Sequence, residues 1–403
     1  METYKKSHAH RIINTLVSIM VCVGAVYLYK YTKHNSVFKV EATKLELISA
    51  PLLRVPNFDD DESDIGFFWF NAYNTDISNM DLSNLGNKID FMSFDNLTKF
   101  PSADKLPAGF NPEKLLEDGK NPGLGIRDLH AKGITGKGVT VAIIDWPLYT
   151  DHQETKDNFI HYEELDWDKR KFDYEFHGIA MASIICGKTV GVAPGVNLAY
   201  FAPNITKGTE GETPAGNGNT YISNDIAALR KILEMNKKLP KDKKISAVSI
   251  SRGWYQKSNL YPEFKKVVNE LIDSGVMVLH VGTWAYDNLK GYVLLDREPN
   301  SDPDNVSSYS IGHPGGNLAI PNGGRTIAGN QATDNYRYDG KRQGGSSDSV
   351  AYTVGVYALA KQVYPDLMPK EFFDIVLKTG YNVNNQYVII QPTKIIEYLQ
   401  NKK

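Results

Sequence analysis

VTVAII, at residues 139–144, is apolar or β-branched at every position and is followed directly by Asp145. A strand in the middle of a parallel sheet is buried on both faces and lacks the polar alternation of a half-exposed strand. We therefore predict a buried parallel strand here, with the Asp145 carboxylate at its carboxyl end. Functional sites of open α/β sheets form at that edge.

Strand and helix patterns alternate along the rest of the chain. Further strands are predicted at residues 197–202, 245–249 and 276–281. Helical spacing of apolar residues predicts helices at 177–186, 222–237, 261–274, 347–364 and 369–379. Strands separated by helices indicate an α/β fold of three layers, in which a mostly parallel central sheet carries helices on both faces.

The composition excludes several classes of protein. The chain has 403 residues, 41% of them hydrophobic and 23% charged, which is ordinary for a globular protein. A net charge of −2 gives no electrostatic basis for binding nucleic acid. The two cysteines, Cys22 and Cys186, are far apart, which indicates neither a disulfide framework nor a zinc site.

The N-terminus contains an apolar segment. Residues 1–11 are short and basic, and residues 12–29 form an 18-residue run without a charged side chain. That length is near the minimum for a membrane span. A cleaved signal peptide is the alternative, but bulky residues stand where a small-residue cleavage site would follow the run. We predict a single-pass anchor in the cell membrane with the rest of the chain outside the cytoplasm, although basic residues flank both ends of the run.

Residues 30–118 differ from the remainder in composition. They contain the acidic run DDDESD at 59–64, the aromatic run IGFFWF at 65–70 and several prolines. We interpret them as a linker and N-terminal extension that docks onto a main domain at 119–403. A cleavable propeptide is the alternative, but no repeat or small-domain pattern supports it.

Three polar residues stand at the ends of predicted elements. Asp145 ends a strand, His177 begins a helix of small residues, and Ser347 follows two glycines at the start of another helix. Each has an ordinary structural explanation when taken alone, such as a surface carboxylate or a helix cap. Together they supply a nucleophile, a base and a carboxylate that orients the base, in the chain order Asp, His, Ser.

Four sequence blocks, which follow one another along the chain, make the pattern specific. They are GITGKGVTVAIID at 133–145, HGIAMASIICGKTVGVAP at 177–194, AVSISRG at 247–253 and GSSDSVAYTVGVYAL at 345–359. Over roughly residues 120–395 the chain resembles the subtilisin-like serine proteases (subtilases), as a divergent, membrane-anchored, bacterial-type member.

The resemblance implies a function. It implies a subtilisin-like fold and a serine endopeptidase in which Ser347 attacks a peptide bond, His177 takes its proton and Asp145 orients His177. Ser251, Arg252 and Gly253 would pair with the backbone of the substrate as an added strand. The expected partner is a protein or peptide, and the sequence leaves the oligomeric state open.

Other positions depart from the family pattern. Thr283 stands where the family has an asparagine that stabilises the oxyanion, so Thr283 and the nearby Asn288 are the candidate donors. Asp348 places a negative charge beside the nucleophile. These departures keep two alternatives open, namely an impaired pseudoprotease that acts as a binding or regulatory module, and an esterase on the same fold.

The sequence predicts no cofactor or metal. The family calcium site needs a loop that wraps a cation with several oxygen ligands. Here the connection at residues 187–190 is short, and Glu154 near a family ligand position is interpreted as a surface residue.

Overall fold

The computed structural model describes residues 37–39, 70–167, 176–215, 218, 220–253, 255–282 and 285–402. The chain divides into two compact units, Met1–Lys39 and Val40–Lys403, and all the helices and strands below belong to the second. The predicted anchor at 12–29 lies outside the described residues. Within those residues, no helix is both long enough and apolar enough to cross a membrane.

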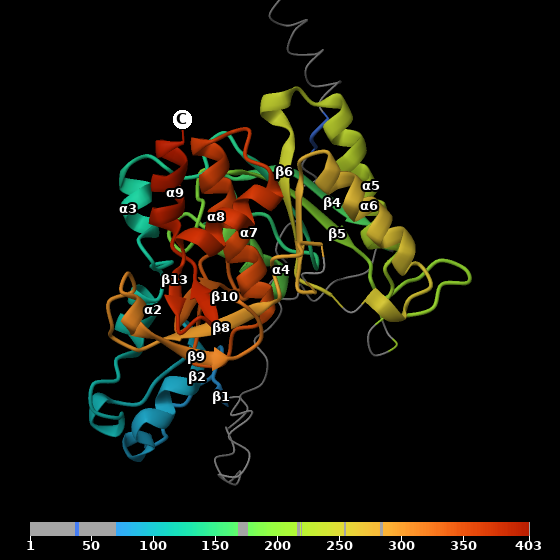
Figure 1. Ribbon diagram of the computed structural model, residues 1–403. Helices are drawn as coiled ribbons and strands as arrows, with labels where there is room; N and C mark the ends of the chain where they lie inside the picture. Colours follow the sequence, from blue (N-terminus) through green and yellow to red (C-terminus); the bar gives the residue numbers. More distant parts are fainter. Residues whose placement is uncertain are drawn as a thin grey trace, which may run out of the picture. The chain divides into compact units, whose positions relative to one another are not determined.

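A five-stranded parallel sheet forms the centre of the second unit (Figure 1). Its strands are β3 (Thr140–Ile144), β4 (Phe159–Leu165), β5 (Asn197–Pro203), β6 (Ile245–Ile250) and β7 (Met277–His280). They lie in the order β4-β5-β3-β6-β7, and every neighbouring pair is parallel. All five residues of β3 are buried, as the apolar run at 139–144 predicted.

Helices cover both faces of this sheet. One layer contains α4 (Phe176–Cys186) and α7 (Ser346–Val363), and the other contains α5 (Ser223–Lys238) and α6 (Tyr261–Asp273) (Figure 1). Small side chains let α4 and α7 pack closely, and nearly every residue of both helices is buried. The predicted three-layer α/β fold is confirmed. The remaining helices are α2 (Pro112–Asp118), α3 (Ile126–Ala131), α8 (Pro369–Thr379) and α9 (Pro392–Asn401). Short 3-10 turns are η2 (Ser83–Phe91), η3 (Ala103–Lys105), η4 (Lys241–Lys243), η5 (Tyr255–Lys257) and η6 (Val306–Ser308).

A second sheet is built from the C-terminal part of the chain. Its order is β13-β14-β10-β8-β9, with both parallel and antiparallel pairs. The strands are β8 (Tyr292–Arg297), β9 (Tyr309–His313), β10 (Leu318–Pro321), β13 (Tyr381–Val383) and β14 (Tyr387–Ile389). The residue that follows β10, Asn322, lies beside the loop that carries Ser347.

A third sheet joins the N-terminal extension to later parts of the chain. It contains β1 (Phe70–Asn71), β2 (Met92–Asp95), β12 (Tyr336–Asp339) and β11 (Arg325–Ala328), in that order. β2 pairs with β12 in antiparallel register. The rings of Phe94 and Tyr338 stack with centroids 5.1 Å apart in a small apolar core under the sheet. Strands from both sides of the predicted boundary at 118/119 therefore share one sheet.

Candidate active site

Asp145 lies at the carboxyl end of β3. Its backbone N–H donates to the carbonyl oxygen of Phe201 on the neighbouring strand, and its side chain is 1% exposed. The Oδ1 atom accepts two hydrogen bonds, one of 2.7 Å from the backbone N–H of Trp146 and one of 2.8 Å from His177 Nδ1. The carboxylate is therefore fixed at the sheet edge where the sequence predicted it.

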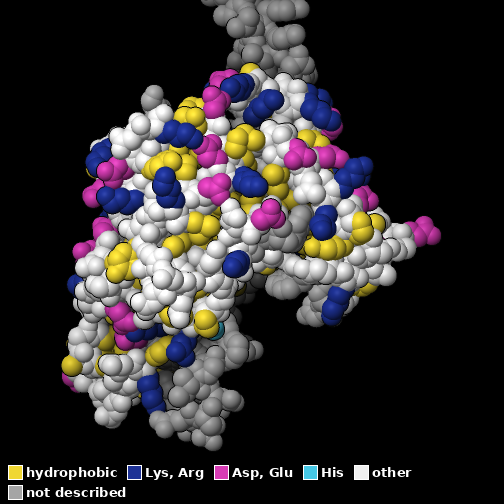
Figure 2. Space-filling view, in the orientation of Figure 1, with side chains coloured by type: hydrophobic (Ala, Val, Ile, Leu, Met, Phe, Trp, Pro, Cys, Tyr) yellow, Lys and Arg dark blue, Asp and Glu magenta, His cyan; other side chains and the backbone are white. Residues whose placement is uncertain are grey.

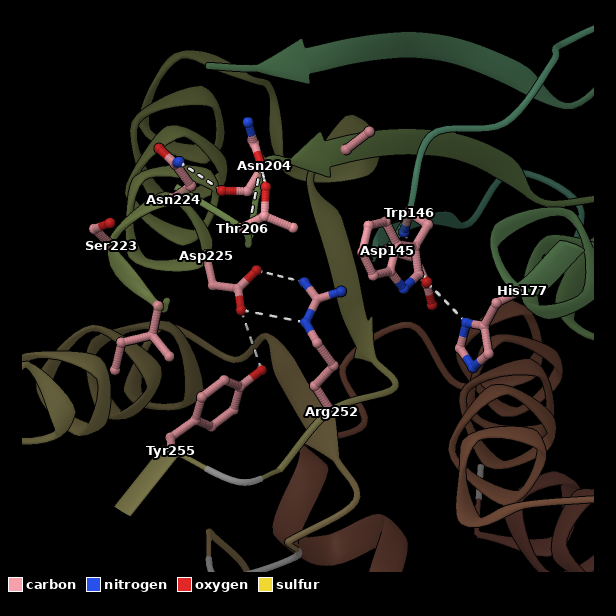
Figure 3. Close-up of polar contacts among 12 residues, drawn as sticks. Asp145, Trp146, His177, Asn204, Thr206, Ser223, Asn224, Asp225, Arg252 and Tyr255 are labelled. Atoms are coloured by element: carbon pink, nitrogen blue, oxygen red, sulfur yellow. Dashed lines mark hydrogen bonds and ion pairs between the residues drawn. The ribbon is translucent and has the colours of Figure 1, made fainter. Parts of the chain in front are cut away.

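His177 lies in the first turn of α4. The helix passes close to the end of β3, because a side chain at Gly178 would come within 2.5 Å of the Trp146 carbonyl oxygen. Figure 3 shows the His177 imidazole turned toward the Asp145 carboxylate. A histidine that donates from Nδ1 to a carboxylate keeps Nε2 free to accept a proton.

Ser347 lies in the first turn of α7, after a tight loop. A side chain at Gly344 would meet Asn322 Oδ1 at 1.7 Å, so this position of the loop requires glycine. Asn322 holds the loop through hydrogen bonds from Nδ2 to the carbonyl oxygen of Gly345 (2.7 Å) and to Ser349 Oγ (3.2 Å). This role of Asn322 was not predicted from the sequence. The only signal for it is an asparagine directly after a short apolar run.

The three predicted residues meet in the folded chain. Ser347 Oγ lies 3.2 Å from His177 Nε2, and His177 Nδ1 lies 2.8 Å from Asp145 Oδ1. Ser347 Oγ also lies 3.4 Å from the carbonyl oxygen of Ser251. A hydroxyl, an imidazole and a buried carboxylate in this sequence can pass a proton from the serine to the histidine.

The charges around the site keep Asp145 ionised and favour the protonated form of His177. Burial opposes ionisation of Asp145, but the charge and hydrogen bond of His177 and the charge of Arg252 outweigh it and lower the pKa of Asp145. Burial likewise opposes a charged His177, but Asp145, and then the charge of Asp348, raise the pKa of His177 above its ordinary value. The imidazolium formed during proton transfer is thus stabilised.

Asp348, the unexpected acid beside Ser347, caps α7. Its Oδ2 accepts the backbone N–H of Gly345 at 2.9 Å, and its own N–H donates to the Gly345 carbonyl oxygen at 3.0 Å. Burial, together with the negative charge of Asp339, raises the pKa of Asp348 to about 6, against the opposing effect of Arg325. The carboxylate therefore stabilises the helix start, and its charge changes close to neutral pH.

The segment predicted to bind substrate continues β6 beside the triad. Ser251 and Gly253 are buried, and the Arg252 side chain forms an internal ion pair with Asp225 of α5 (Figure 3). The side chain of Arg252 is only 5% exposed. Tyr255 donates a further hydrogen bond to Asp225 at 3.3 Å. Any contact between a peptide and this segment would accordingly use its backbone.

Of the two candidate oxyanion donors, the structure describes only Asn288. Thr283 lies outside the described residues. Asn288 is exposed, and its Nδ2 donates to Asp374 Oδ1 on α8 at 2.6 Å. This contact commits the Asn288 amide elsewhere, so the structure gives no support to that prediction. The first N–H groups of α7, including that of Ser347, are placed at a helix N-terminus, where such groups lack a partner within the helix.

Glu154 is buried, not on the surface as the sequence suggested. It is 2% exposed, and its carboxylate accepts hydrogen bonds from Thr189 N–H, Thr189 Oγ1, Val190 N–H and the Tyr336 hydroxyl. These four donors satisfy the carboxylate of Glu154 within the protein. Among the described residues, no group of three or more His, Cys, Asp or Glu side chains could hold a metal ion.

Comparisons with known proteins find relatives among the subtilisin-like proteases. Residues 136–285 match the sequence model of the subtilase family. The chain is 25% identical over 296 residues to the subtilisin-like protease PopC of Myxococcus xanthus, and 27% identical over 162 residues to the major intracellular serine protease of Bacillus subtilis. These matches cover 64% and 38% of this chain. They span 58% and 44% of the two relatives, so the chain matches about half the length of each.

The comparisons support a relationship between this chain and the subtilase family. A solved structure from the work on subtilase cytotoxin SubAB assembly superposes with a TM-score of 0.52 at 14% identity, covering 70% of this chain and 96% of that one. At such low identity the superposition shows the subtilase fold alone. The family match includes the strand that ends at Asp145 and the helix that carries His177, whereas Ser347 lies beyond it.

Proposed function

We propose that this protein is a serine endopeptidase that hydrolyses peptide bonds through Asp145, His177 and Ser347. The observation that carries the proposal is the pair of contacts at His177, 2.8 Å to Asp145 and 3.2 Å to Ser347. The subtilase match over residues 136–285 supports the same chemistry.

The reaction proceeds in two halves. Ser347 Oγ forms a bond to the peptide carbonyl carbon while His177 Nε2 takes its proton, and the carbonyl oxygen becomes negative. The imidazolium, stabilised by Asp145, then gives the proton to the leaving amine as the C–N bond breaks. Water attacks the resulting ester by the same route, releases the acid and restores the hydroxyl of Ser347.

The substrate is a protein or peptide that lies along Ser251, Arg252 and Gly253. This segment extends β6 next to the nucleophile, because the Ser251 carbonyl oxygen lies 3.4 Å from Ser347 Oγ. A peptide added as a strand gains affinity from main-chain hydrogen bonds, which depend little on its sequence. On the face drawn in Figure 2, basic and acidic side chains are interspersed, without a patch of one sign that would select a highly charged partner.

Attachment to the cell membrane belongs to the same proposal. It rests on the uncharged run at 12–29 and its flanking basic residues. In this arrangement the residues after the anchor act outside the cytoplasm. No cofactor or metal takes part, because the chemistry requires only the three side chains and water.

A fluorophosphonate probe that reacts with activated serines tests the proposal. We expect the full chain to be labelled and Ser347→Ala to lose the label. Ser346→Ala, one residue away on the same helix turn, is the matched control and keeps it. Labelling that persists in Ser347→Ala contradicts the assignment of the nucleophile, and a folded wild type that is never labelled contradicts the enzyme.

A binding or regulatory module that does not cut is the second candidate. The buried carboxylate of Asp348 next to Ser347 supports it, since negative charge there opposes formation of an oxyanion. Hydrolysis of a peptide substrate by the wild type, lost in Ser347→Ala, decides in favour of the peptidase. If the protein hydrolyses small esters but not peptides, it is an esterase.

A further inference from the structure

The loop that leads to Ser347 is bound along one side by the N-terminal extension. This nucleophile loop comprises residues 340–345. Three hydrogen bonds connect it to the extension: Gly340 N–H to Ser93 Oγ (3.1 Å), Lys341 N–H to the Asp90 carbonyl oxygen (2.9 Å) and Gln343 Nε2 to the Phe91 carbonyl oxygen (3.2 Å).

The contact between the two segments is close. A side chain at Gly340 would meet the Met92 carbonyl oxygen at 2.6 Å and the Asp90 carbonyl oxygen at 2.9 Å. Backbone therefore packs directly on backbone here. Ser93, which accepts from Gly340, is completely buried. A buried N–H that loses its acceptor costs about 1 to 3 kcal/mol, so this contact resists separation.

The extension also reaches the helix that carries His177. The Arg337 guanidinium carbon lies 3.8 Å from the ring centroid of Tyr73 on one side and 3.8 Å from that of Phe176 on the other. Phe176 directly precedes His177, and their rings are 6.2 Å apart. The Tyr73 hydroxyl donates to Asp339 Oδ1 at 2.7 Å, which fixes the stack to β12.

We infer that residues 70–100 are a permanent positioning brace for Ser347 and His177, in which Ser93 holds the nucleophile loop and Tyr73 holds the start of α4. This inference rests on the proposed function for its catalytic consequence. It assigns these residues to the working enzyme, in contrast to a propeptide that must leave before the site can act. Ser93 acts through the nucleophile loop that it binds, and Tyr73 acts through Arg337, which stacks on Phe176 at the start of α4.

Alignment of the reacting groups makes the brace consequential. A displacement of about 1 Å at a catalytic group can cost roughly 100-fold in rate. The distance from Ser347 Oγ to His177 Nε2 is already 3.2 Å. A displacement of the nucleophile loop that lengthens it would weaken proton transfer directly. The brace restrains this loop from outside the strand–helix unit that contains Ser347.

Ser93→Ala and Tyr73→Ala in the full chain test the inference. We expect the second-order rate of fluorophosphonate labelling at Ser347, measured on folded protein, to fall about tenfold or more in each. Tyr73→Phe keeps the ring against Arg337 and loses only the bond to Asp339, so it should remain folded and lose less. Ser78→Ala is the matched control, since Ser78 is exposed on the same extension and, among the described residues, its hydrogen bonds go to Asp76.

Hydrogen exchange provides a readout that does not need activity. We expect the backbone amides of residues 340–348 to exchange at least several-fold faster in Ser93→Ala and Tyr73→Ala, and unchanged in Ser78→Ala. Unchanged exchange in both variants overturns the brace, as does a wild-type labelling rate in folded Ser93→Ala and Tyr73→Ala. If the wild type is never labelled, the proposed function fails, and the exchange result alone still supports or overturns the brace.

Discussion

Asp348 and Gly345 are joined by two hydrogen bonds that close the first turn of α7, of 2.9 Å to the carboxylate and 3.0 Å from the Asp348 N–H. Burial raises the pKa of Asp348 from 3.8 to about 6 in the folded chain. The folded state therefore holds this proton more tightly than the unfolded state does. The stabilisation due to the proton is complete below pH 3.8 and is lost as the pH rises to about 6.

The substitution Asp348→Asn should change the free energy of unfolding more favourably at pH 8 than at pH 4. An amide keeps an acceptor for the Gly345 N–H and carries no charge, so it avoids a cost of up to about 3 kcal/mol at high pH. Chemical denaturation at the two pH values measures the difference. A variant whose change in stability is equal at both values would show that Asp348 does not titrate between them.

The acid limb of kcat/KM should report His177. The base must be neutral to accept the Ser347 proton, and the pKa of His177 lies above its ordinary 6.5. Activity should therefore fall as the pH drops through a value above 6.5. A limb well below 6.5 would contradict the charge arrangement, in which Asp145 is the dominant favourable partner of the imidazolium.

Asp145→Asn should lower kcat by about four orders of magnitude. The amide keeps the shape of the carboxylate but lets His177 adopt the tautomer that carries its proton on Nε2, where it cannot accept from Ser347. Single-turnover kinetics with a peptide ester would measure this loss. Ser346→Ala serves as the control. Asn158→Asp would not serve, because the Asn158 amide donates to two carbonyl oxygens and its loss would disturb the fold.

Replacing one partner of the Asp225–Arg252 ion pair should lower the unfolding free energy more than replacing both. Both side chains are nearly inaccessible, at 0% and 5% exposure. Arg252→Met should cost about 3 to 5 kcal/mol of unfolding free energy because it strands a buried carboxylate, whereas Arg252→Met with Asp225→Leu should recover much of that loss. Urea denaturation of the four proteins in this cycle gives the coupling energy.

An exposed pair provides the control for that cycle. Lys241 and Asp366 are 84% and 71% exposed, and solvent screens their interaction. Lys241→Met should leave the unfolding free energy nearly unchanged. If Arg252→Met is equally harmless, the buried pair does not contribute to the stability of the chain.

Local sequence patterns predicted the central sheet except for β4, and the four helices that cover it. β3 is apolar or β-branched at every position, the middle of α7 is a run of mostly small and apolar residues, and α5 and α6 repeat apolar residues at helical spacing. Each therefore signals its own structure without help from distant residues. The positions of Asp145, His177 and Ser347 follow from the ends of such elements. Their meeting could be predicted because parallel strands share one carboxyl edge.

Contacts between distant segments could not be predicted in the same way. β2 is only four residues long, and its pairing with β12 depends on residues more than 200 positions later. Arg252 was predicted to lie along the substrate, and its burial depends on the ion pair with Asp225 of α5, which the sequence does not indicate. The burial of Glu154 could not be predicted, because the donors that surround it, from Thr189, Val190 and Tyr336, come from two other segments.

Glu154→Gln should destabilise the chain, and a chelator should not. The Glu154 carboxylate accepts from Thr189 N–H and Thr189 Oγ1 at 2.7 Å each, and also from the hydroxyl of Tyr336. Hydrogen bonds to a charged group contribute about 1.5 to 3 kcal/mol each, and an amide can replace only some of them, so we expect Tm to fall by several degrees. Because these donors already satisfy the carboxylate, excess EDTA should leave the wild-type Tm unchanged. A wild-type Tm that falls with EDTA and returns with Ca²⁺ would show a cation site that these hydrogen bonds do not replace.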